Sequence, residues 1–198
     1  GNVIPDAWKW HSAKHGGTAG PTSATSRNNL SENVDTLAAQ AGAPDAVLLH
    51  IGVNDLAANY QTPASTFISW TNVIERLVTD LPESKIVATT LIYGNIAYST
   101  RLAQASSITT FNELVRDFFE NDKPASWSNV ILLDMNTLVG TYADKEADEG
   151  ITYNASNDYL HPDWWGHDQM AEGWLAAIKS NYSANGADST FASAGGFP

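Results

Sequence analysis

The sequence predicts an α/β fold, a three-layer α/β/α sandwich in which helices cover both faces of a mostly parallel sheet. Continuous apolar runs alternate along the chain with segments whose apolar residues recur at helical spacing. Such runs are typical of strands buried on both faces, and their alternation with helices favours a parallel sheet. No internal repeat or linker divides the chain. We therefore expect one domain over residues 1–182 and a flexible tail over 183–198.

The first strand and helix of this pattern follow an irregular opening. Residues 1–43 contain a short apolar start, a Gly-rich turn and one helix, without a full strand. The run "PDAVLLHIGVND" (44–55) then predicts a central strand that follows a proline and precedes a polar turn. The segment 64–81 predicts a helix with one apolar stripe. That stripe consists of Phe67, Trp70, Ile74, Leu77 and Val78.

The remaining elements repeat the alternation. The runs "KIVATTLIY" (85–93) and "NVILLDM" (129–135) predict two further strands, and residues 106–122 predict the helix between them. The stripe of that helix consists of Phe111, Leu114, Val115 and Phe118. A last helix is expected at about 163–181. Its apolar positions are Trp165, Met170, Trp174, Ala177 and Ile178.

Composition narrows the classes of function. The formal charge of −12 repels phosphate backbones and anionic lipid, and the apolar runs fall short of the roughly 20 residues of a membrane span. We therefore expect neither nucleic acid nor a membrane as a partner. We also expect the protein to be a monomer. The chain has no cysteine, which excludes thiol catalysis and cysteine-based zinc sites. Three glycosylation tripeptides, at Asn29, Asn154 and Asn181, favour a secreted glycoprotein.

Polar residues follow the predicted strands where a parallel sheet binds its ligands. Asn54 comes directly after the first central strand, and Asp158 and His161 precede the last helix. A carboxylate three residues before an imidazole, in a turn that Pro162 rigidifies, can accept from one ring nitrogen and leave the other facing a cleft. These two residues would be the base and its orienting carboxylate in a Ser-His-Asp catalytic triad. Taken singly, Asn54 could be a turn former and Asp158 a helix-start signal.

Three segments together resemble a known family. They are "AGPT" (19–22), "PDAVLLHIGVNDL" (44–56) and "DYLHPDWWGHDQMAEGW" (158–174). The sequence resembles the SGNH hydrolases, the GDSL lipase and esterase superfamily, and within it the family-3 carbohydrate esterases, which are mostly acetylxylan esterases. The resemblance covers about residues 1–180. It implies the SGNH hydrolase fold with a flavodoxin-like sheet.

The resemblance also implies roles for particular residues. His161 would be the general base and Asp158 its orienting carboxylate, while the Asn54 amide and the Gly20 backbone N–H would bind the oxyanion. The reaction would be the hydrolysis of an ester on an acetylated oligo- or polysaccharide, outside the cell, without metal or cofactor. Trp10, Trp164 and Trp165 are the candidates for contact with the sugar, although tryptophan is also a common core residue.

One block of the family pattern has no counterpart. The family's Gly-Asp-Ser block, at the end of its first strand, supplies the nucleophilic serine, and no such strand and motif occur in these residues. We expect the first strand and its serine to lie upstream of Gly1. Ser12 and Ser189 are weaker candidates, because neither follows an apolar strand. His11 and His15 have a spacing that could bind a metal, but no third ligand is evident.

Two other functions stay open at this point. A noncatalytic protein could hold a glycan in the cleft through its tryptophans without attacking it. Alternatively, the chain could be a fragment that is active only when the missing strand is supplied. A vacancy in the sheet would then leave backbone groups unpaired and favour association.

Overall fold

The computed structural model describes residues 39, 44–57, 61–92, 99–139 and 164–183. The described part contains one three-stranded parallel sheet with the strand order β1-β2-β3. Its strands are β1 (Ala46–Leu49), β2 (Lys85–Thr89) and β3 (Val130–Leu133). In register, Leu49 lies opposite Ala88 and Thr89 lies opposite Leu133. The three predicted strands are therefore confirmed, each shorter than its apolar run.

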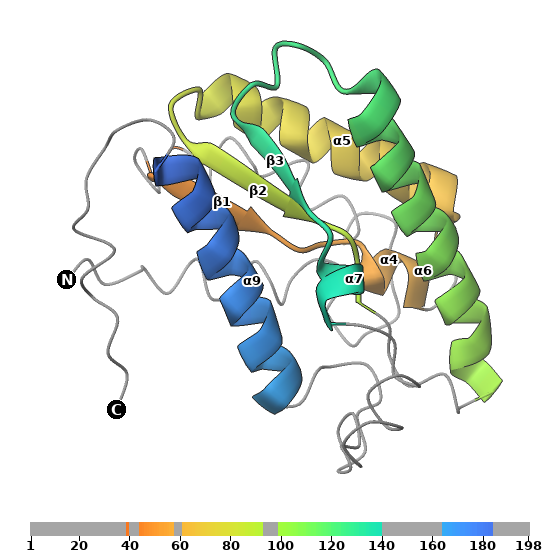
Figure 1. Cartoon of the computed structure of the whole chain (residues 1–198). Helices are drawn as coiled ribbons and strands as arrows, with labels where there is room; N and C mark the ends of the chain where they lie inside the picture. The colour runs from red at the N-terminus through yellow and green to blue at the C-terminus, as the bar shows by residue number, and fades with distance from the viewer. Residues whose placement is uncertain (1–38, 40–43, 58–60, 93–98, 140–163, 184–198) are drawn as a thin grey trace.

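Helices lie on both faces of this sheet (Figure 1). The helices α5 (Pro63–Asp80) and α6 (Ser99–Asp117) pack on one face, and α9 (Trp164–Ser183) packs on the other against β2 and β3. The short helices α4 (Val53–Ala57) and α7 (Met135–Val139) directly follow β1 and β3. The predicted three-layer α/β fold is thus confirmed. Among the described helices, none combines the length and the apolar content that a membrane crossing requires.

The start of α5 shows how local sequence sets a helix boundary. Thr62 is the N-cap, and its hydroxyl accepts a hydrogen bond of 3.2 Å from the backbone N–H of Ser65. Pro63 occupies the first turn, where a missing N–H has no cost. The predicted stripe of α5 is confirmed in its centre, because Trp70, Ile74 and Leu77 are buried.

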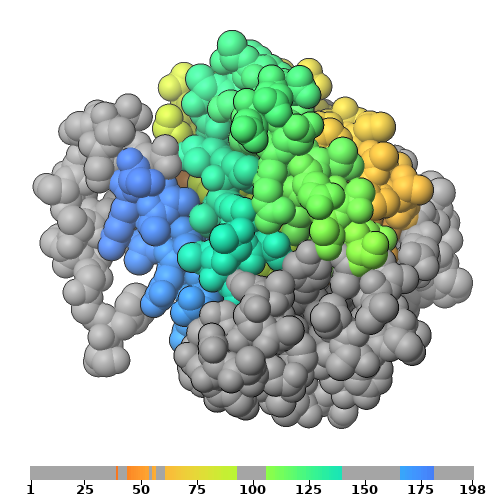
Figure 2. Space-filling view, turned by 45° about the vertical axis from the view of Figure 1, so that its right-hand side comes forward, coloured from red at the N-terminus to blue at the C-terminus, as the bar shows by residue number. Residues whose placement is uncertain are grey.

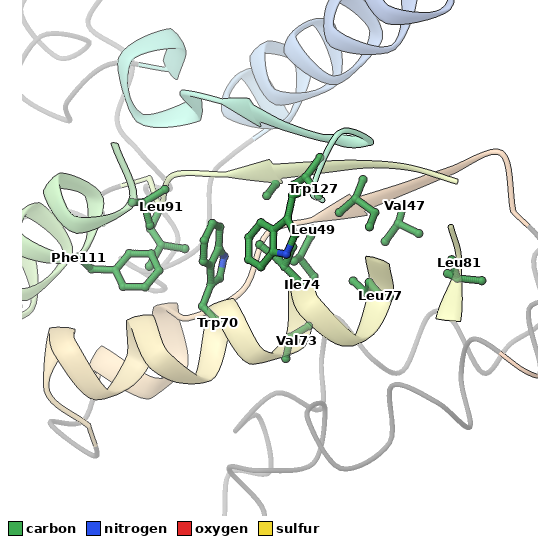
Figure 3. Close-up of a cluster of buried hydrophobic side chains, with 14 of the residues drawn as sticks. Val47, Leu49, Trp70, Val73, Ile74, Leu77, Leu81, Leu91, Phe111 and Trp127 are labelled. Atoms are coloured by element: carbon green, nitrogen blue, oxygen red, sulfur yellow. The ribbon is translucent and has the colours of Figure 1, made fainter. Parts of the chain in front are cut away.

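The main core lies between the sheet and the pair α5 and α6 (Figure 3). Trp70 is buried there and meets the ring of Phe111 edge-on, with the ring centroids 6.2 Å apart. A π-helical turn, η1 (Phe118–Asp122), continues α6. Within it Phe118 contacts the ring of Trp127, and Phe119 contacts that of Trp70. The contact with Trp70 joins the end of α6 to α5, and the contact with Trp127 joins it to the segment before β3.

A smaller core lies on the other face of the sheet, where α9 and α7 meet. It consists of Ile92, Met135 and Val139, with Leu133, Met170 and Trp174 packed against it. The prediction that every strand is buried on both faces is wrong for β1. Leu48 on this strand is 46% exposed, because α9 packs against β2 and β3.

Candidate active site

The carboxyl ends of the three strands meet at one edge of the sheet, as they must in a parallel sheet. His50, Thr90 and Asp134 are the first residues beyond β1, β2 and β3. The helices α4 and α7 begin at this edge, and the first turn of α9 lies at the same end of the molecule (Figure 1). Ligands of open α/β sheets bind at this edge.

Gly52 makes the sharp turn between β1 and α4. Its φ is +120°, a backbone conformation that residues with a Cβ rarely adopt. A Cβ at this position would lie 3.3 Å from both Leu91 Cδ1 and Thr66 Cγ2. The Gly52 carbonyl accepts the hydrogen bond of 3.2 Å from Leu56 N–H that closes α4. Glycine at this point therefore fixes the direction in which the chain leaves the sheet, and so the position of the backbone at Asn54, the second residue of α4.

His50 is half-buried at the end of β1. Its Nδ1 lies 2.7 Å from the hydroxyl oxygen of Thr89, and that hydroxyl lies 3.2 Å from the carbonyl of Leu49. Since the hydroxyl donates to the carbonyl, its oxygen accepts from His50, which places the imidazole proton on Nδ1. Burial lowers the pKa of His50 to about 4, so the ring is neutral at pH 7.

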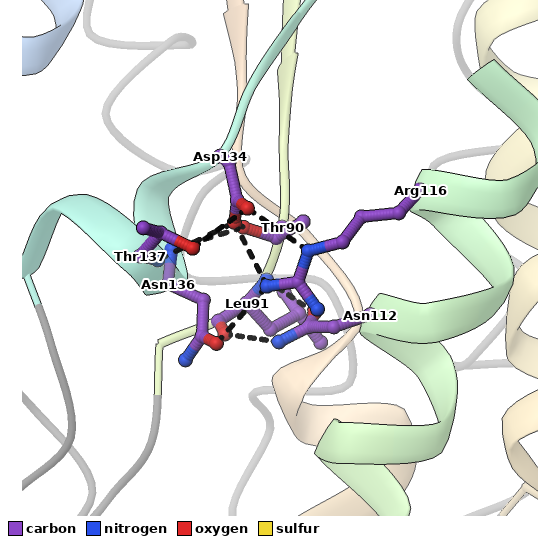
Figure 4. A network of polar contacts seen from close by, with 7 residues as sticks. All are labelled: Thr90, Leu91, Asn112, Arg116, Asp134, Asn136 and Thr137. Atoms are coloured by element: carbon purple, nitrogen blue, oxygen red, sulfur yellow. Dashed lines mark hydrogen bonds and ion pairs between the residues drawn. The ribbon is translucent and has the colours of Figure 1, made fainter. Parts of the chain in front are cut away.

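The strongest polar contact at this edge joins α6 to the end of β3 (Figure 4). Arg116 donates from Nε to Asp134 Oδ2 over 2.9 Å and from Nη2 to Asp134 Oδ1 over 3.0 Å. Thr90 donates its hydroxyl to the same carboxylate over 2.7 Å. Asp134 also caps α7, because it accepts from the backbone N–H and the hydroxyl of Thr137. One carboxylate therefore connects β2, β3, α6 and α7.

These contacts determine the charge of Asp134. Its partial burial acts to raise the pKa, but the hydrogen bonds from Arg116, Thr90 and Thr137 and the charge of Arg116 outweigh this effect. The net result lowers the pKa of Asp134 to about 2. The carboxylate is consequently ionised and fully engaged, which suits a structural anchor and does not suit a general base.

Two amides complete this polar region. Asn112 is fully buried, and its side chain accepts from Leu91 N–H and donates to the Leu91 carbonyl, each over 2.8 Å. These bonds satisfy the backbone just beyond β2. The Asn136 side chain accepts from Arg116 over 3.2 Å, while its buried Nδ2 has no hydrogen-bond partner.

The structure describes only some of the predicted site residues. Asn54 lies in α4 at the carboxyl edge, as predicted, although its side chain is outside the described part. Trp164 and Trp165 form the beginning of α9, again without described side chains. Gly20, Asp158, His161 and Trp10 lie outside the described residues, and so do the weaker candidates Ser12, Ser189, His11 and His15. Their roles stay predictions.

Sequence reasoning missed the polar residues that organise this edge. Asp134 directly follows the four apolar residues of "VILLDM", and an acidic residue directly after a buried strand was an available signal. Arg116 and Thr90 gave no comparable signal, because their partners are 18 and 44 residues away in the sequence. Within the described ranges, no group of three His, Asp or Glu side chains could hold a metal ion.

Comparison with known proteins identifies a family and a fold. The model of the GDSL-like lipase/acylhydrolase family matches residues 5–169. A family-3 carbohydrate esterase from Talaromyces cellulolyticus has a similar structure, with a TM-score of 0.56 and 19% identity, over 80% of this chain and 66% of that one. The chain thus spans just under two thirds of that protein's length. No curated protein matches the chain.

Two further solved structures share the fold. A mutant of an acetyl esterase, solved with acetate, gives a TM-score of 0.58 at 15% identity over 87% of this chain and 88% of that one. A mutant of an acetyl-xylooligosaccharide esterase from Geobacillus Stearmophilus gives 0.53 at 20% identity, over 76% and 66%. At such identities the likeness establishes the fold alone.

Proposed function

The chain belongs to the GDSL-like lipase/acylhydrolase family, and on that premise we propose that it is a carboxylic ester hydrolase of the SGNH type. The observation that carries the proposal is the position of Asn54. It stands in the first turn of α4, after the Gly52 turn, at the carboxyl edge of the sheet, and α9 begins at the same end of the molecule. An amide donor at this edge suits the binding of an oxyanion.

The proposed reaction follows the Ser-His-Asp scheme. A serine hydroxyl attacks the ester carbonyl while His161 removes its proton, and Asp158 orients the imidazole. The amide of Asn54 and the backbone N–H of Gly20 donate to the oxyanion of the tetrahedral intermediate. His161 then protonates the departing alcohol, and a water molecule activated by the same imidazole releases the acid and restores the serine.

The proposed substrate is an acetylated plant polysaccharide such as acetylxylan. Two of the structural neighbours support this choice, because one is a family-3 carbohydrate esterase and the other an acetyl-xylooligosaccharide esterase. Trp164, Trp165 and Trp10 are proposed to stack on the sugar rings. A polymeric substrate that cannot enter cells also requires a secreted enzyme, and we propose that location.

The test is the release of acetate from acetylated xylo-oligosaccharides by the protein expressed from its natural start codon. We expect acetate release in the wild type and a fall of at least about 1,000-fold in kcat for His161→Ala, because the base is removed. Asn54→Ala should lower kcat by about 100-fold or more with little change in KM, since its donor acts mainly on the transition state.

A matched control separates loss of chemistry from loss of fold. His167→Ala removes an exposed imidazole on α9, six residues from His161 in the sequence, and should leave the rate unchanged. Binding of the oligosaccharide without acetate release in the wild type would instead support a noncatalytic glycan-binding protein. Equal activity of His161→Ala and the wild type would refute the proposed base.

A further inference from the structure

The core-facing side of α6 contains one buried amide. Ile108, Phe111 and Val115 of this face are fully buried, and Asn112 completes the same helical stripe. A buried amide is stable only when its polar atoms are paired. Both polar atoms of Asn112 are paired with the backbone of Leu91, which lies beyond the residues of β2 that pair with β1 and β3 (Figure 4). Asn112 therefore does for Leu91 what a neighbouring strand does for the residues of β2.

The side chain of Leu91 covers the turn at Gly52. A Cβ at Gly52 would lie 3.3 Å from Leu91 Cδ1 and 3.7 Å from Phe111 Cζ, so both side chains lie close to the backbone of the turn. Leu91 and Phe111 are fully buried, and neither can turn aside into solvent (Figure 3). The helix α6 consequently supports the turn in two ways, directly through Phe111 and through Leu91, whose backbone Asn112 binds.

The elements behind these contacts are themselves held in place. Figure 2 shows α6, in green, between α7, in teal, and α5, in orange, and α6 packs against α5. Thr90 donates its hydroxyl to Asp134 over 2.7 Å and its backbone N–H to the Leu133 carbonyl over 3.3 Å. The segment after β2 is therefore bound to β3 at Thr90 and to α6 at Leu91. Loss of the Asn112 amide would release only the second of these attachments.

The turn at Gly52 leads directly into α4. The Gly52 carbonyl accepts from Leu56 N–H over 3.2 Å, and this bond spans the helical turn that contains Asn54. The backbone of Asn54 follows Gly52 by two residues, so its position depends on that of the turn. A displacement of about 1 Å in a group that acts on the transition state can lower a rate by about 100-fold.

We propose that Asn112 is a positioning residue for the Gly52 turn, because it binds Leu91 against the turn and so fixes the backbone from which Asn54 reaches the oxyanion. The effect on catalysis rests on the proposed function of Asn54, whereas the effect on the turn can be measured without it. Asn112 touches neither substrate nor reacting atoms and acts through Leu91.

The amino edge of the sheet offers a matched control for the amide. Asn129 is also a buried asparagine, directly before β3, and its Nδ2 donates to the backbone carbonyl of Ser84 over 2.9 Å. Asn112→Ala and Asn129→Ala therefore both leave buried backbone groups unpaired, at opposite edges of the sheet. A purely structural role for Asn112 predicts that the two variants behave alike once their stabilities are matched.

A second pair of variants tests the contact between Leu91 and the turn. Leu91→Val shortens the side chain that reaches Gly52 and keeps the backbone hydrogen bonds to Asn112. Leu81 is a buried leucine at the end of α5, near the amino edge, and Leu81→Val is the control. These milder changes decide the matter if Asn112→Ala does not fold.

The first readout is hydrogen exchange of the Leu56 backbone N–H, followed by NMR in the naturally expressed protein without substrate. We expect exchange at least about tenfold faster in Asn112→Ala than in Asn129→Ala after correction for global stability, because the turn opens locally. Leu91→Val should speed it at least about threefold relative to Leu81→Val. Equal exchange within each pair of folded variants would overturn the positioning role.

The second readout is the hydrolysis of p-nitrophenyl acetate, which connects the turn to Asn54. Asn112→Ala should lower kcat at least about tenfold with little change in KM, because it displaces a donor that acts mainly on the transition state. Asn129→Ala should leave both constants unchanged. In an Asn54→Ala background, Asn112→Ala should lower kcat less than about twofold, since the group that it positions is gone.

The outcomes separate the two proposals. An equal fall in kcat with and without the Asn54 amide would overturn the link between Asn112 and Asn54. A wild-type kcat in Asn54→Ala would instead refute the proposed oxyanion donor, and the exchange of Leu56 N–H would still decide whether Asn112 positions the turn.

Discussion

Arg116 and Asp134 form a two-pronged ion pair that joins α6 to the end of β3, with N–O distances of 2.9 and 3.0 Å. The pair fixes the start of α7 and one side of the carboxyl edge of the sheet. Its carboxylate also accepts from Thr90 and Thr137, so its contribution is to bring four chain segments together. Ion pairs in such networks contribute more than isolated surface pairs.

The first prediction concerns acid stability. The pKa of Asp134 is lowered to about 2 in the folded protein from 3.8, so the stabilisation is present above pH 3.8 and is lost as the pH falls toward 2. The side chain is 34% exposed, and solvent screening reduces the effect to about 1 kcal/mol. Urea unfolding between pH 4.5 and 2.5 should show this extra loss in the wild type and not in Asp134→Asn.

A second prediction concerns His50, which titrates in a different range. Burial lowers its pKa in the folded protein to about 4 from 6.5. The unfolded chain therefore binds a proton first, and stability falls as the pH drops from about 6.5 to 4, by about 2 kcal/mol. His50→Asn keeps a donor toward Thr89 and should remove this pH dependence. An unchanged slope of unfolding free energy against pH in that variant would contradict the assignment.

A third prediction concerns Asn112, which satisfies both backbone groups of Leu91. Asn112→Ala leaves a buried N–H and a buried carbonyl unpaired, and should cost about 2 to 4 kcal/mol of unfolding free energy. Asn112→Asp keeps the acceptor but loses the donor, so it should also destabilise. Asn121→Ala, which removes an exposed amide bonded to Asp117, is the matched control and should cost less than about 0.5 kcal/mol.

A fourth prediction concerns the turn that places Asn54. Gly52→Ala forces a Cβ onto a φ of +120° and should cost about 1 to 3 kcal/mol. The Cβ would also lie 3.3 Å from the Thr66 methyl group, a tight contact that Thr66→Ser removes, but the strained φ remains, so Thr66→Ser should not restore the stability of the Gly52→Ala variant. Rescue by Thr66→Ser, measured by thermal unfolding, would show that crowding and not the backbone conformation requires glycine.

The sequence allowed the main elements of the fold to be predicted, because long strands and helices carry their own periodicity. The stripe around Trp70 in α5 and the apolar run of β2 are local patterns of this kind. The helices α4 and α7 were missed, since each has five residues and lies within or beside an apolar run. The start of α6 at Ser99, seven residues before the predicted one, was missed because its first turns lack a clear apolar stripe.

The candidate site was predictable only where motifs are continuous in the sequence. Asn54 follows a recognisable strand and was correctly placed at the carboxyl edge. The association of Arg116 with Asp134 depends on the packing of α6 beside β3, and no local sequence pattern predicts such a contact. The exposure of Leu48 likewise depends on where α9 lies, which the strand's own composition does not encode.

The most direct test of the proposed function is covalent labelling of the naturally expressed protein with a fluorophosphonate, followed by peptide mapping. Such reagents modify a serine activated by a histidine base. We predict one labelled serine in the wild type and labelling at least about 100-fold slower in His161→Ala, with His167→Ala unaffected. Labelling that proceeds equally fast without the His161 imidazole, or no labelled serine at all, would contradict a Ser-His-Asp esterase built on this edge of the sheet.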